Sequence, residues 1–361
     1  MPKVTVIMPS LNVAPYIRTS MESVTRQTLR DIEILCVDAG STDGTRGILL
    51  EYAQRDDRVR LIDSPRKSYG YQINLGVDQA QGEYIGIVET DDYIEPTMYE
   101  TLYAQAKAED LDILKADYFV LTESRGRKSR IPCHLSRRKS HYGVIFEPSK
   151  DIVYFNDTLY TWAGIYKTEF LRRNHIRHNE TPGASFQDNG FWFQTFSLAK
   201  RVEFRREALY VLRRDNPDSS VFAKEKVFCE CEEYDFIRAF LRGHPELEDK
   251  LAPVCAYRRF KSYMSTLKRI AAEYRPAFLE RFSRDFRKIR ADGELDRAMF
   301  SNTEWQVLCW ILEDPQARLP ALLRNARTEC VNSLFLRGLH CAQEHGLVYT
   351  AKYMFLGRIK N

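Results

Sequence analysis

The chain has 361 residues, of which 44% are hydrophobic and 29% are charged, and its formal net charge at pH 7 is only +4. This much apolar content can form a sizeable core, which excludes a mainly disordered protein, and the absence of any run of about 18 apolar residues predicts no membrane-spanning helix. The first residues lead directly into a strand-like pattern without an apolar signal segment, so we expect a cytoplasmic protein.

Short apolar runs alternate with amphipathic stretches over the first half of the sequence. The runs cover residues 4–8, 32–37, 59–62 and 84–88. Turn-forming residues separate them, among them Gly82 after a predicted helix near 71–80. This alternation is typical of an α/β fold with mainly parallel strands, whose ligands bind at the carboxyl ends of the strands.

Two later segments differ from this pattern. Residues 123–150 are polar, basic and rich in turn formers, and we interpret them as a long excursion from the sheet rather than as core. From about residue 223 onward, β-like runs disappear and helical periodicity dominates. We therefore predict an α/β domain over residues 1–222 and an α-helical region over residues 223–361.

Three acids in four residues, Glu89, Asp91 and Asp92, follow the apolar run at 84–88. Carboxylates this close repel one another, and a divalent cation removes the conflict. Mg²⁺ or Mn²⁺ is commonly held by one or two carboxylates together with substrate phosphates. A solvated turn whose acids cap the next helix explains the same residues, so the pattern alone leaves both interpretations open.

Asp38 and Asp188 are the other candidate acids. Asp38 ends a buried run, where an acid can accept hydrogen bonds from a nucleobase or a ribose, although the turn that follows also suits a helix cap. Asp188 precedes the aromatic run 191–193, and a carboxylate partly desolvated by aromatic rings suits a general base. Capping of a helix near 189–199 is the alternative for Asp188.

Arginines and hydroxyl groups follow the strand-like run 208–212. Arg213 and Arg214 precede a polar loop that contains Ser219. Arginine forks and hydroxyls suit a diphosphate, whose negative charge grows when a glycosidic bond breaks. A surface arginine pair has the same local sequence, so only its order among the other motifs favours a functional role.

These segments, in this order, resemble the inverting family 2 glycosyltransferases of the GT-A fold, in particular bacterial enzymes of capsule and lipopolysaccharide synthesis. The matching motifs are Pro9-x-x-Asn12, the turn from Asp38 to Gly44, Asn74-x-Gly76, Gly82-Glu83-Tyr84, the acidic cluster and Gln187-Asp188. The resemblance covers residues 3–222. One such motif is weak support, whereas several in register are strong support.

The resemblance implies a Rossmann-like mixed sheet, mainly parallel and flanked by helices, with a donor site at one edge. Asp38 would bind the nucleobase of a nucleoside-diphosphate sugar. Pro9, Ser10, Asn12 and Asn74 would belong to the same donor site. UDP is the family's commonest donor nucleotide, so a UDP-sugar is the expected donor.

The resemblance also implies how the reaction proceeds. Asp91, helped by Asp92, would hold the Mn²⁺ or Mg²⁺ that bridges the diphosphate. Asp188 would take the proton of an acceptor hydroxyl as that hydroxyl attacks the anomeric carbon in line, which inverts the configuration. The departing diphosphate would be neutralised by Arg213, Arg214 and Ser219. The acceptor would be a saccharide or a lipid-linked saccharide.

The chain departs from the family's motifs at two positions. Glu89 stands where the family usually has Asp, and Gln187 stands where it usually has Glu. A non-catalytic protein that binds sugar nucleotide or acts as a scaffold is therefore the main alternative. Asp91, Asp92 and Asp188 are retained and favour an enzyme. A dehydrogenase is disfavoured because no Gly-x-Gly-x-x-Gly follows the first predicted strand.

The segment 257–290 carries eleven Lys or Arg residues against three acids. A basic amphipathic segment of this kind contacts anionic lipid or nucleic acid, or covers a core face. No nucleic-acid motif is present, so we expect no nucleic-acid partner. Peripheral contact with the inner face of the cytoplasmic membrane is one hypothesis for this segment, and an oligomer interface is another.

Overall fold

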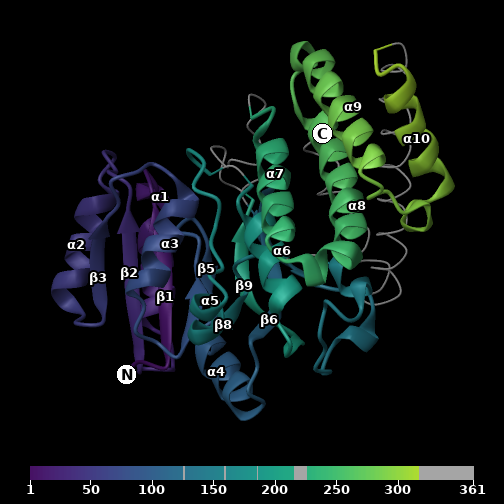
Figure 1. The fold of residues 1–361 in the computed structure, drawn as a ribbon. Helices are drawn as coiled ribbons and strands as arrows, with labels where there is room; N and C mark the ends of the chain where they lie inside the picture. Colours follow the sequence, from purple (N-terminus) through teal and green to yellow (C-terminus); the bar gives the residue numbers. More distant parts are fainter. Residues whose placement is uncertain (125–126, 158–159, 185, 215–225, 317–361) are drawn as a thin grey trace. The chain divides into compact units, whose positions relative to one another are not determined.

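The structure is a computed structural model that describes residues 1–124, 127–157, 160–184, 186–214 and 226–316 (Figure 1). Its contacts divide the chain into two compact units. The first unit comprises Met1–Thr122, Pro132–Phe222 and Cys229–Cys255, and the second comprises Glu123–Ile131, Ala223–Phe228 and Ala256–Asn361. The candidate site residues all belong to the first unit.

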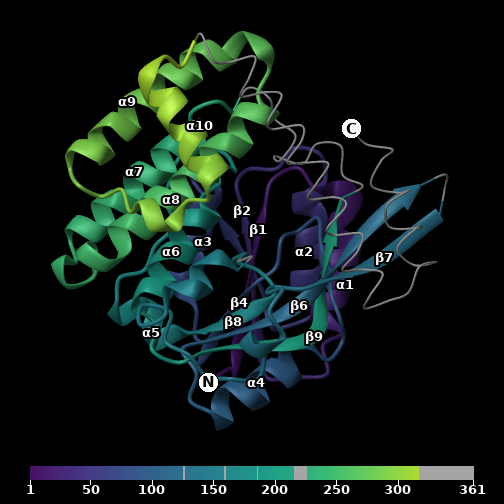
Figure 2. The same cartoon turned by 90° about the vertical axis from the view of Figure 1, so that its right-hand side faces the viewer.

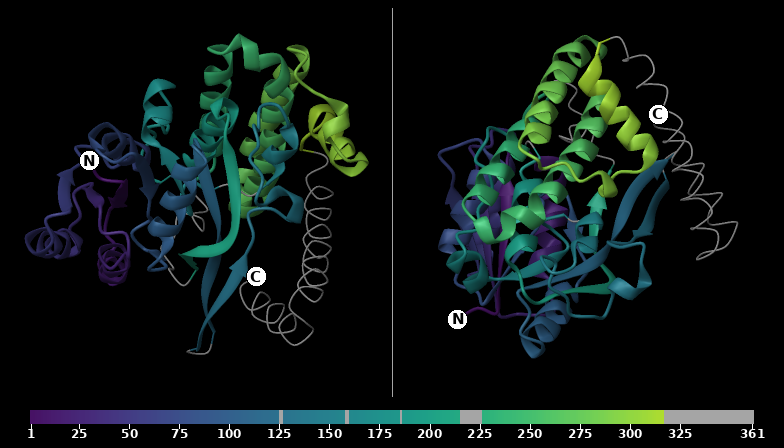
Figure 3. Two further views of the ribbon diagram at one scale, coloured as in Figure 1. Left: turned by 90° about the horizontal axis from the view of Figure 1, so that it is seen from below. Right: turned by 45° about the vertical axis from the view of Figure 1, so that its right-hand side comes forward.

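A mixed sheet forms the centre of the first unit. Its strands lie in the order β3-β2-β1-β4-β8-β6-β9-β5. Their bounds are β1 Val4–Ser10, β2 Ile32–Asp38, β3 Val59–Asp63, β4 Tyr84–Ile87, β5 Tyr93–Ile94, β6 Ile113–Ser124, β8 Gly164–Lys167 and β9 Val202–Arg213. The strands β1 to β4 pair in parallel, β8 is antiparallel to β4 and β6, and the long strands β6 and β9 are parallel neighbours (Figures 2 and 3).

The apolar runs form this sheet because both of its faces are covered. Every residue of β1, β2 and β4 is buried, as is typical of parallel strands with helices on both sides. The helices of the first unit are α1 Ala14–Thr25, α2 Thr45–Arg55, α3 Tyr69–Gln79, α4 Met98–Ala108, α5 Thr168–Arg173, α6 Asp188–Leu198 and α7 Cys229–Arg242. The four predicted strands and the helix near 71–80 are thereby confirmed.

The prediction that residues 123–150 form an excursion outside the core is wrong in part. β6 continues to Ser124, β7 covers Arg127–Cys133, and the side chains of Leu135 and Phe146 are buried. Asp117 explains how a polar segment packs inward, because its buried carboxylate accepts hydrogen bonds from the Leu135 amide at 2.9 Å and the Tyr142 hydroxyl at 2.7 Å. These buried hydrogen-bond partners could not be predicted from the polar sequence of the segment.

Over residues 256–316 the second unit is helical apart from short connections. It contains the end of α8 Pro245–Arg269, then α9 Arg275–Ala291 and α10 Asn302–Glu313, and Pro276 stands in the first turn of α9. The aromatic side chains of residues 257–290 form a core, in which Tyr263 packs edge to face on Phe282. The buried Arg259 donates to Asp285 at 2.6 Å, so at least one cation of the basic segment serves this core.

Candidate active site

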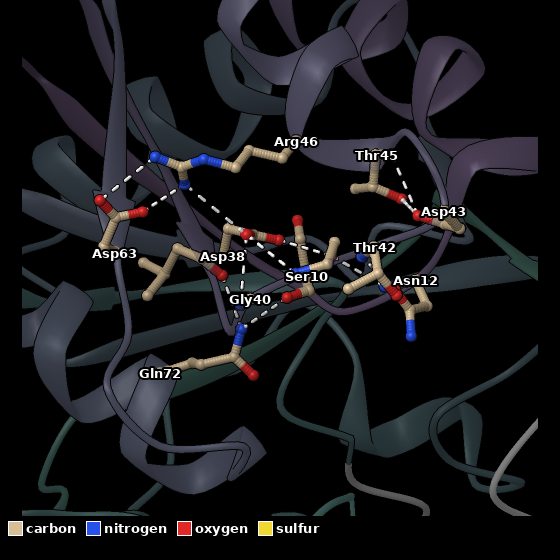
Figure 4. Close-up of polar contacts among 12 residues, drawn as sticks. Ser10, Asn12, Asp38, Gly40, Thr42, Asp43, Thr45, Arg46, Asp63 and Gln72 are labelled. Atoms are coloured by element: carbon tan, nitrogen blue, oxygen red, sulfur yellow. Dashed lines mark hydrogen bonds and ion pairs between the residues drawn. The ribbon is translucent and has the colours of Figure 1, made fainter.

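The loops that follow β1 and β2 are fastened to each other. The Asn12 side chain accepts a hydrogen bond from the Thr42 amide at 2.8 Å, and the Asn12 amide donates to the Ser41 hydroxyl at 2.9 Å (Figure 4). Asp43 accepts a hydrogen bond from the Ala14 amide at 2.9 Å. Asn12 has a φ of 54°, a left-handed conformation that asparagine tolerates better than most residues. Asn12 therefore shapes the predicted donor edge.

Asp38 closes the turn at the end of β2. Its buried carboxylate accepts hydrogen bonds from the Gly40 amide at 3.2 Å, the Ser41 amide at 3.1 Å and the Ser41 hydroxyl at 2.5 Å. Arg46 lies 3.7 Å from the same carboxylate and also pairs with Asp63 (Figure 4). The structure thus shows the turn-closing role of Asp38, and contact with a nucleobase stays a prediction.

Pro9 and Ser10 connect the end of β1 to its neighbours through their carbonyl groups. The Thr90 hydroxyl donates to the Pro9 carbonyl at 2.7 Å. The Gln72 amide donates to the Ser10 carbonyl at 3.0 Å and to the Val37 carbonyl at 2.6 Å. The Thr90 bond holds the end of β1 against the acidic segment after β4, and the Gln72 bonds hold the ends of β1 and β2 against α3.

The acidic cluster after β4 divides into carboxylates with different surroundings. Glu89 accepts a hydrogen bond from the Tyr69 hydroxyl at 2.7 Å, and burial, followed by the charge of Asp91, raises the pKa of Glu89 to about 8. Asp92 is buried and accepts hydrogen bonds from the Tyr210 hydroxyl at 2.8 Å and the Arg213 amide at 2.6 Å. Asp92 therefore ties β9 to this segment, whereas Glu89 and Asp91 are both half-buried.

These residues fit a metal ion only if the substrate supplies further ligands. Among the residues that the structure describes, no group of three or more His, Cys, Asp or Glu side chains could hold a metal ion. Both oxygens of Asp92 already accept hydrogen bonds from the protein. Mg²⁺ and Mn²⁺ commonly take one or two carboxylates and complete their shell with water and phosphate oxygens. Asp91 fits that arrangement, and the predicted metal site stays a prediction.

Asp188 is the first residue of α6, and Gln187 rather than Asp188 stands at the N-cap position of this helix. Burial raises the pKa of its carboxyl to about 6, while hydrogen bonds from backbone amides at the start of the helix lower it. The charge of Asp188 also raises the pKa values of Glu89 and Tyr69. The candidate base therefore lies within electrostatic range of the acidic cluster, although the two are almost a hundred residues apart in the chain.

Gln187 supports the loop before α6 with a group that glutamate lacks. Its buried side-chain amide donates to the Thr181 carbonyl at 3.1 Å, the Thr181 hydroxyl at 3.0 Å and the Gly183 carbonyl at 3.0 Å. A carboxylate accepts hydrogen bonds but cannot donate them to carbonyl oxygens. Gln187 therefore donates hydrogen bonds to this loop that a glutamate at the same position could not donate.

Asn74 is fully engaged with the segment that leads to this loop. Its amide nitrogen donates to the His178 carbonyl at 2.9 Å and to Glu180 at 3.1 Å, and its oxygen accepts from the His178 amide at 2.9 Å. The side chain is buried. Asn74 therefore positions the loop, and its predicted place in the donor site stays a prediction.

Glu233 on α7 is a site residue that sequence reasoning missed. Its buried carboxylate accepts hydrogen bonds from the Gly190 amide at 2.8 Å and the Asn179 side chain at 3.0 Å. Burial, with a contribution from the charge of Asp188, raises the pKa of Glu233 to about 8. The one signal in the sequence is the glycine at position 190, near the start of a predicted helix. The structure explains this glycine, because a Cβ at this position would lie 2.1 Å from a Glu233 oxygen.

The residues predicted to contact the diphosphate have different surroundings in the structure. The Arg213 guanidinium lies 5.4 Å from the ring centre of Tyr93 and 5.5 Å from that of Tyr16, which are cation–π distances. Arg214 is half-buried and its charge acts on the Tyr160 hydroxyl. Ser219 lies outside the described residues, so nothing tests its predicted role.

Comparison with known proteins identifies related sequences. The family description "Glycosyl transferase family 2" matches residues 5–197. The chain is 32% identical to the glycosyltransferase EpsJ of Bacillus subtilis over 60% of this chain and 62% of EpsJ. It is 37% identical to the glycosyltransferase GlyG of Streptococcus pneumoniae over 58% of this chain and 70% of GlyG. The chain thus spans less than two thirds of EpsJ.

One solved structure shares the fold over most of the chain. The crystal structure of Staphylococcus aureus TarS 1–349 in complex with UDP has a TM-score of 0.67 to this structure and is 19% identical in sequence. The match covers 91% of this chain and 92% of that chain. It confirms the predicted architecture, a mainly parallel sheet flanked by helices and followed by a helical region.

The contact between α6 and α7 gives a prediction for Gly190→Ala. The new methyl group would meet the Glu233 carboxylate, so we expect the free energy of unfolding to fall by about 1–3 kcal/mol. Urea unfolding measures this loss. Gly47→Ala on α2 is the matched control, because a Cβ there meets nothing within 4 Å and should be neutral or stabilise by up to about 1 kcal/mol. An equal loss from Gly190→Ala in a Glu233→Ala background would contradict the contact.

Proposed function

The chain belongs to glycosyl transferase family 2, and from that premise we propose that it is a metal-dependent inverting glycosyltransferase. The proposed reaction moves a sugar from a UDP-sugar to a hydroxyl group of a saccharide or lipid-linked saccharide. One observation carries the proposal. Asp188 has a carboxyl pKa raised to about 6 and acts electrostatically on Glu89, beside the proposed metal ligand Asp91.

Asp188 is suited to the chemical step as the base. At neutral pH a carboxyl group with a pKa of about 6 is mostly ionised and is still basic enough to accept a proton in the transition state. The acceptor oxygen forms a bond to the anomeric carbon while the bond from that carbon to the diphosphate oxygen breaks. The hydroxyl proton goes to Asp188, the nucleoside diphosphate departs, and the configuration at the anomeric carbon inverts.

The other proposed roles concern binding of the donor. The turn closed by Asp38 and the β1 end at Pro9 and Ser10 would receive the nucleobase. Asp91 would hold the metal ion, which supplies positive charge for the diphosphate when bound. Arg214, with Arg213 and Ser219, would stabilise the diphosphate as it leaves. A UDP complex of TarS, a protein of this fold, supports UDP as the donor nucleotide.

The relatives support a role in polysaccharide synthesis. The matched proteins include a chondroitin synthase of Escherichia coli, which is 38% identical over 99 residues. We therefore propose a saccharide acceptor from a cell-surface polysaccharide. A scaffold of the same fold is the alternative function, motivated by Glu89 and Gln187, and the donation by Gln187 to three loop oxygens weakens it.

The first test is a thermal-shift screen of UDP, GDP, dTDP and CMP, each with Mn²⁺ and with EDTA. Ligand binding raises apparent stability by mass action, by about 2.7 kcal/mol at a hundred times Kd. We expect UDP to raise the melting temperature in Mn²⁺ and to lose most of this effect in EDTA. An equal UDP effect in EDTA would contradict metal dependence, and no response to any nucleotide would favour the scaffold alternative.

The second test concerns the base. Asp188→Asn should lower the rate of UDP release from a UDP-sugar by about 100-fold or more, because asparagine cannot accept the proton. In the unsubstituted protein the rate should fall as the pH drops below about 6, where Asp188 becomes protonated. The exposed Asp57→Asn is the matched control. Wild-type activity in the Asp188→Asn variant would show that Asp188 is not the base.

We also propose that exposed cations of α8 and α9, among them Lys268, Arg284 and Lys288, contact anionic lipid. No helix in the described part of the chain is long and apolar enough to cross a membrane. Flotation with anionic liposomes should recover the protein, and the charge reversals Arg284→Glu and Lys288→Glu should reduce the recovered fraction severalfold. Equal recovery with neutral liposomes would contradict the proposal.

A further inference from the structure

Three aromatic rings form a column beside the candidate base. Tyr160 stacks on Trp162 with ring centres 4.3 Å apart and planes 8° apart. Trp162 stacks on Tyr210 in turn, with centres 4.6 Å apart and planes 19° apart. Tyr118 packs its edge against both Tyr160 and Trp162. Trp162 therefore lies between two stacked rings, with Tyr118 at its side, as in a close-packed core.

The lower end of the column is anchored to the acidic segment. Tyr210 is fully buried, its hydroxyl donates to Asp92 at 2.8 Å and it accepts a hydrogen bond from the Glu89 amide at 3.1 Å. The column and the proposed metal ligands thus share one support. A shift of the column would break hydrogen bonds of buried polar groups, which is costly.

A buried lysine holds the upper end. The Lys115 ammonium group donates to the carbonyl groups of Tyr160 at 2.6 Å and Thr161 at 3.1 Å, and to the carbonyl of Trp162. Burial lowers the pKa of Lys115 well below its usual range. Burying an ammonium group costs free energy unless it is fully hydrogen-bonded. The contacts of Lys115 with three carbonyl groups therefore hold the backbone at 160–162 in place.

The outer ring differs from the rings below it. Tyr160 is half-buried, whereas Trp162, Tyr118 and Tyr210 are buried. Among the described residues, the rings that contact Tyr160 are Tyr118 at its side and Trp162 on one face. The charges of Asp188 and Arg214 both act on its hydroxyl, so the outer end of the column lies within electrostatic range of the candidate base.

We propose that Tyr160 is the platform for the acceptor, on which a pyranose ring stacks with its apolar C–H face. The inference rests on the proposed transferase function and adds to it the residue on which the acceptor sugar stacks. A saccharide ring placed there presents its hydroxyl groups at the ring edge, within electrostatic range of Asp188. An acyclic polyol or a simple lipid alcohol has no flat apolar face to stack, so the column selects a cyclic sugar.

The test measures binding of simple sugars to the full chain by ligand-observed saturation-transfer NMR. The probes are methyl pyranosides, with the acyclic polyol ribitol as the comparison. The variants are Tyr160→Ala and Tyr160→Leu, which lose the aromatic face, and Tyr160→Phe, which keeps it. The half-buried Tyr52 on α2 supplies the matched control Tyr52→Ala. Circular dichroism and thermal unfolding show which variants are folded, and binding is compared only among those.

We expect the protein to bind a methyl pyranoside and not ribitol. Tyr160→Leu and Tyr160→Ala should weaken pyranoside binding at least tenfold, while Tyr160→Phe and Tyr52→Ala should stay within twofold of the unsubstituted protein. Unchanged binding in a folded Tyr160→Leu variant would overturn the proposal, as would equal loss in Tyr160→Phe. Failure of the transferase function is detected separately, because the UDP thermal shift requires no acceptor.

Discussion

Buried carboxylates that accept hydrogen bonds from backbone amides hold the active-site edge together. Asp92 receives the amide of Arg213, Glu233 receives the amide of Gly190, and Asp38 receives the amide of Ser41. Two of these bonds join segments more than forty residues apart in the chain. A buried acid is costly without such partners, so each bond restricts both segments. These buried carboxylates therefore position the loops around the site.

The same constraint separates the acids that support the site from those that could act in it. Asp38 and Asp92 both stand in motifs that the sequence associates with ligands, yet the structure shows each of them bonded to neighbouring backbone. Asp188, Asp91 and Glu89 are half-buried acids of the site. Chemistry in the proposed reaction thus falls to the acids at the ends of α6 and β4, and the deeper acids keep those ends in place.

The parts of this molecule that the sequence predicted are those encoded locally. Continuous apolar runs identify β1, β2 and β4 because parallel strands are buried on both faces, and Asp188 was placed at the start of a helix. Partners distant in the chain were not predictable. Glu233 lies in an ordinary helical pattern, and nothing near Lys115 indicates the three carbonyl groups that surround it.

The joined loops after β1 and β2 have a consequence for engineering the donor edge. Residues 10–14 and 38–45 exchange hydrogen bonds in both directions, so neither loop keeps its conformation if only the other is changed (Figure 4). A single loop transplanted from a relative with another donor preference would lose the hydrogen-bond partners that the other loop supplies. The two segments therefore have to be exchanged together. A chimera that takes both loops from one protein keeps the hydrogen bonds between them, whereas a chimera that takes only one loop does not.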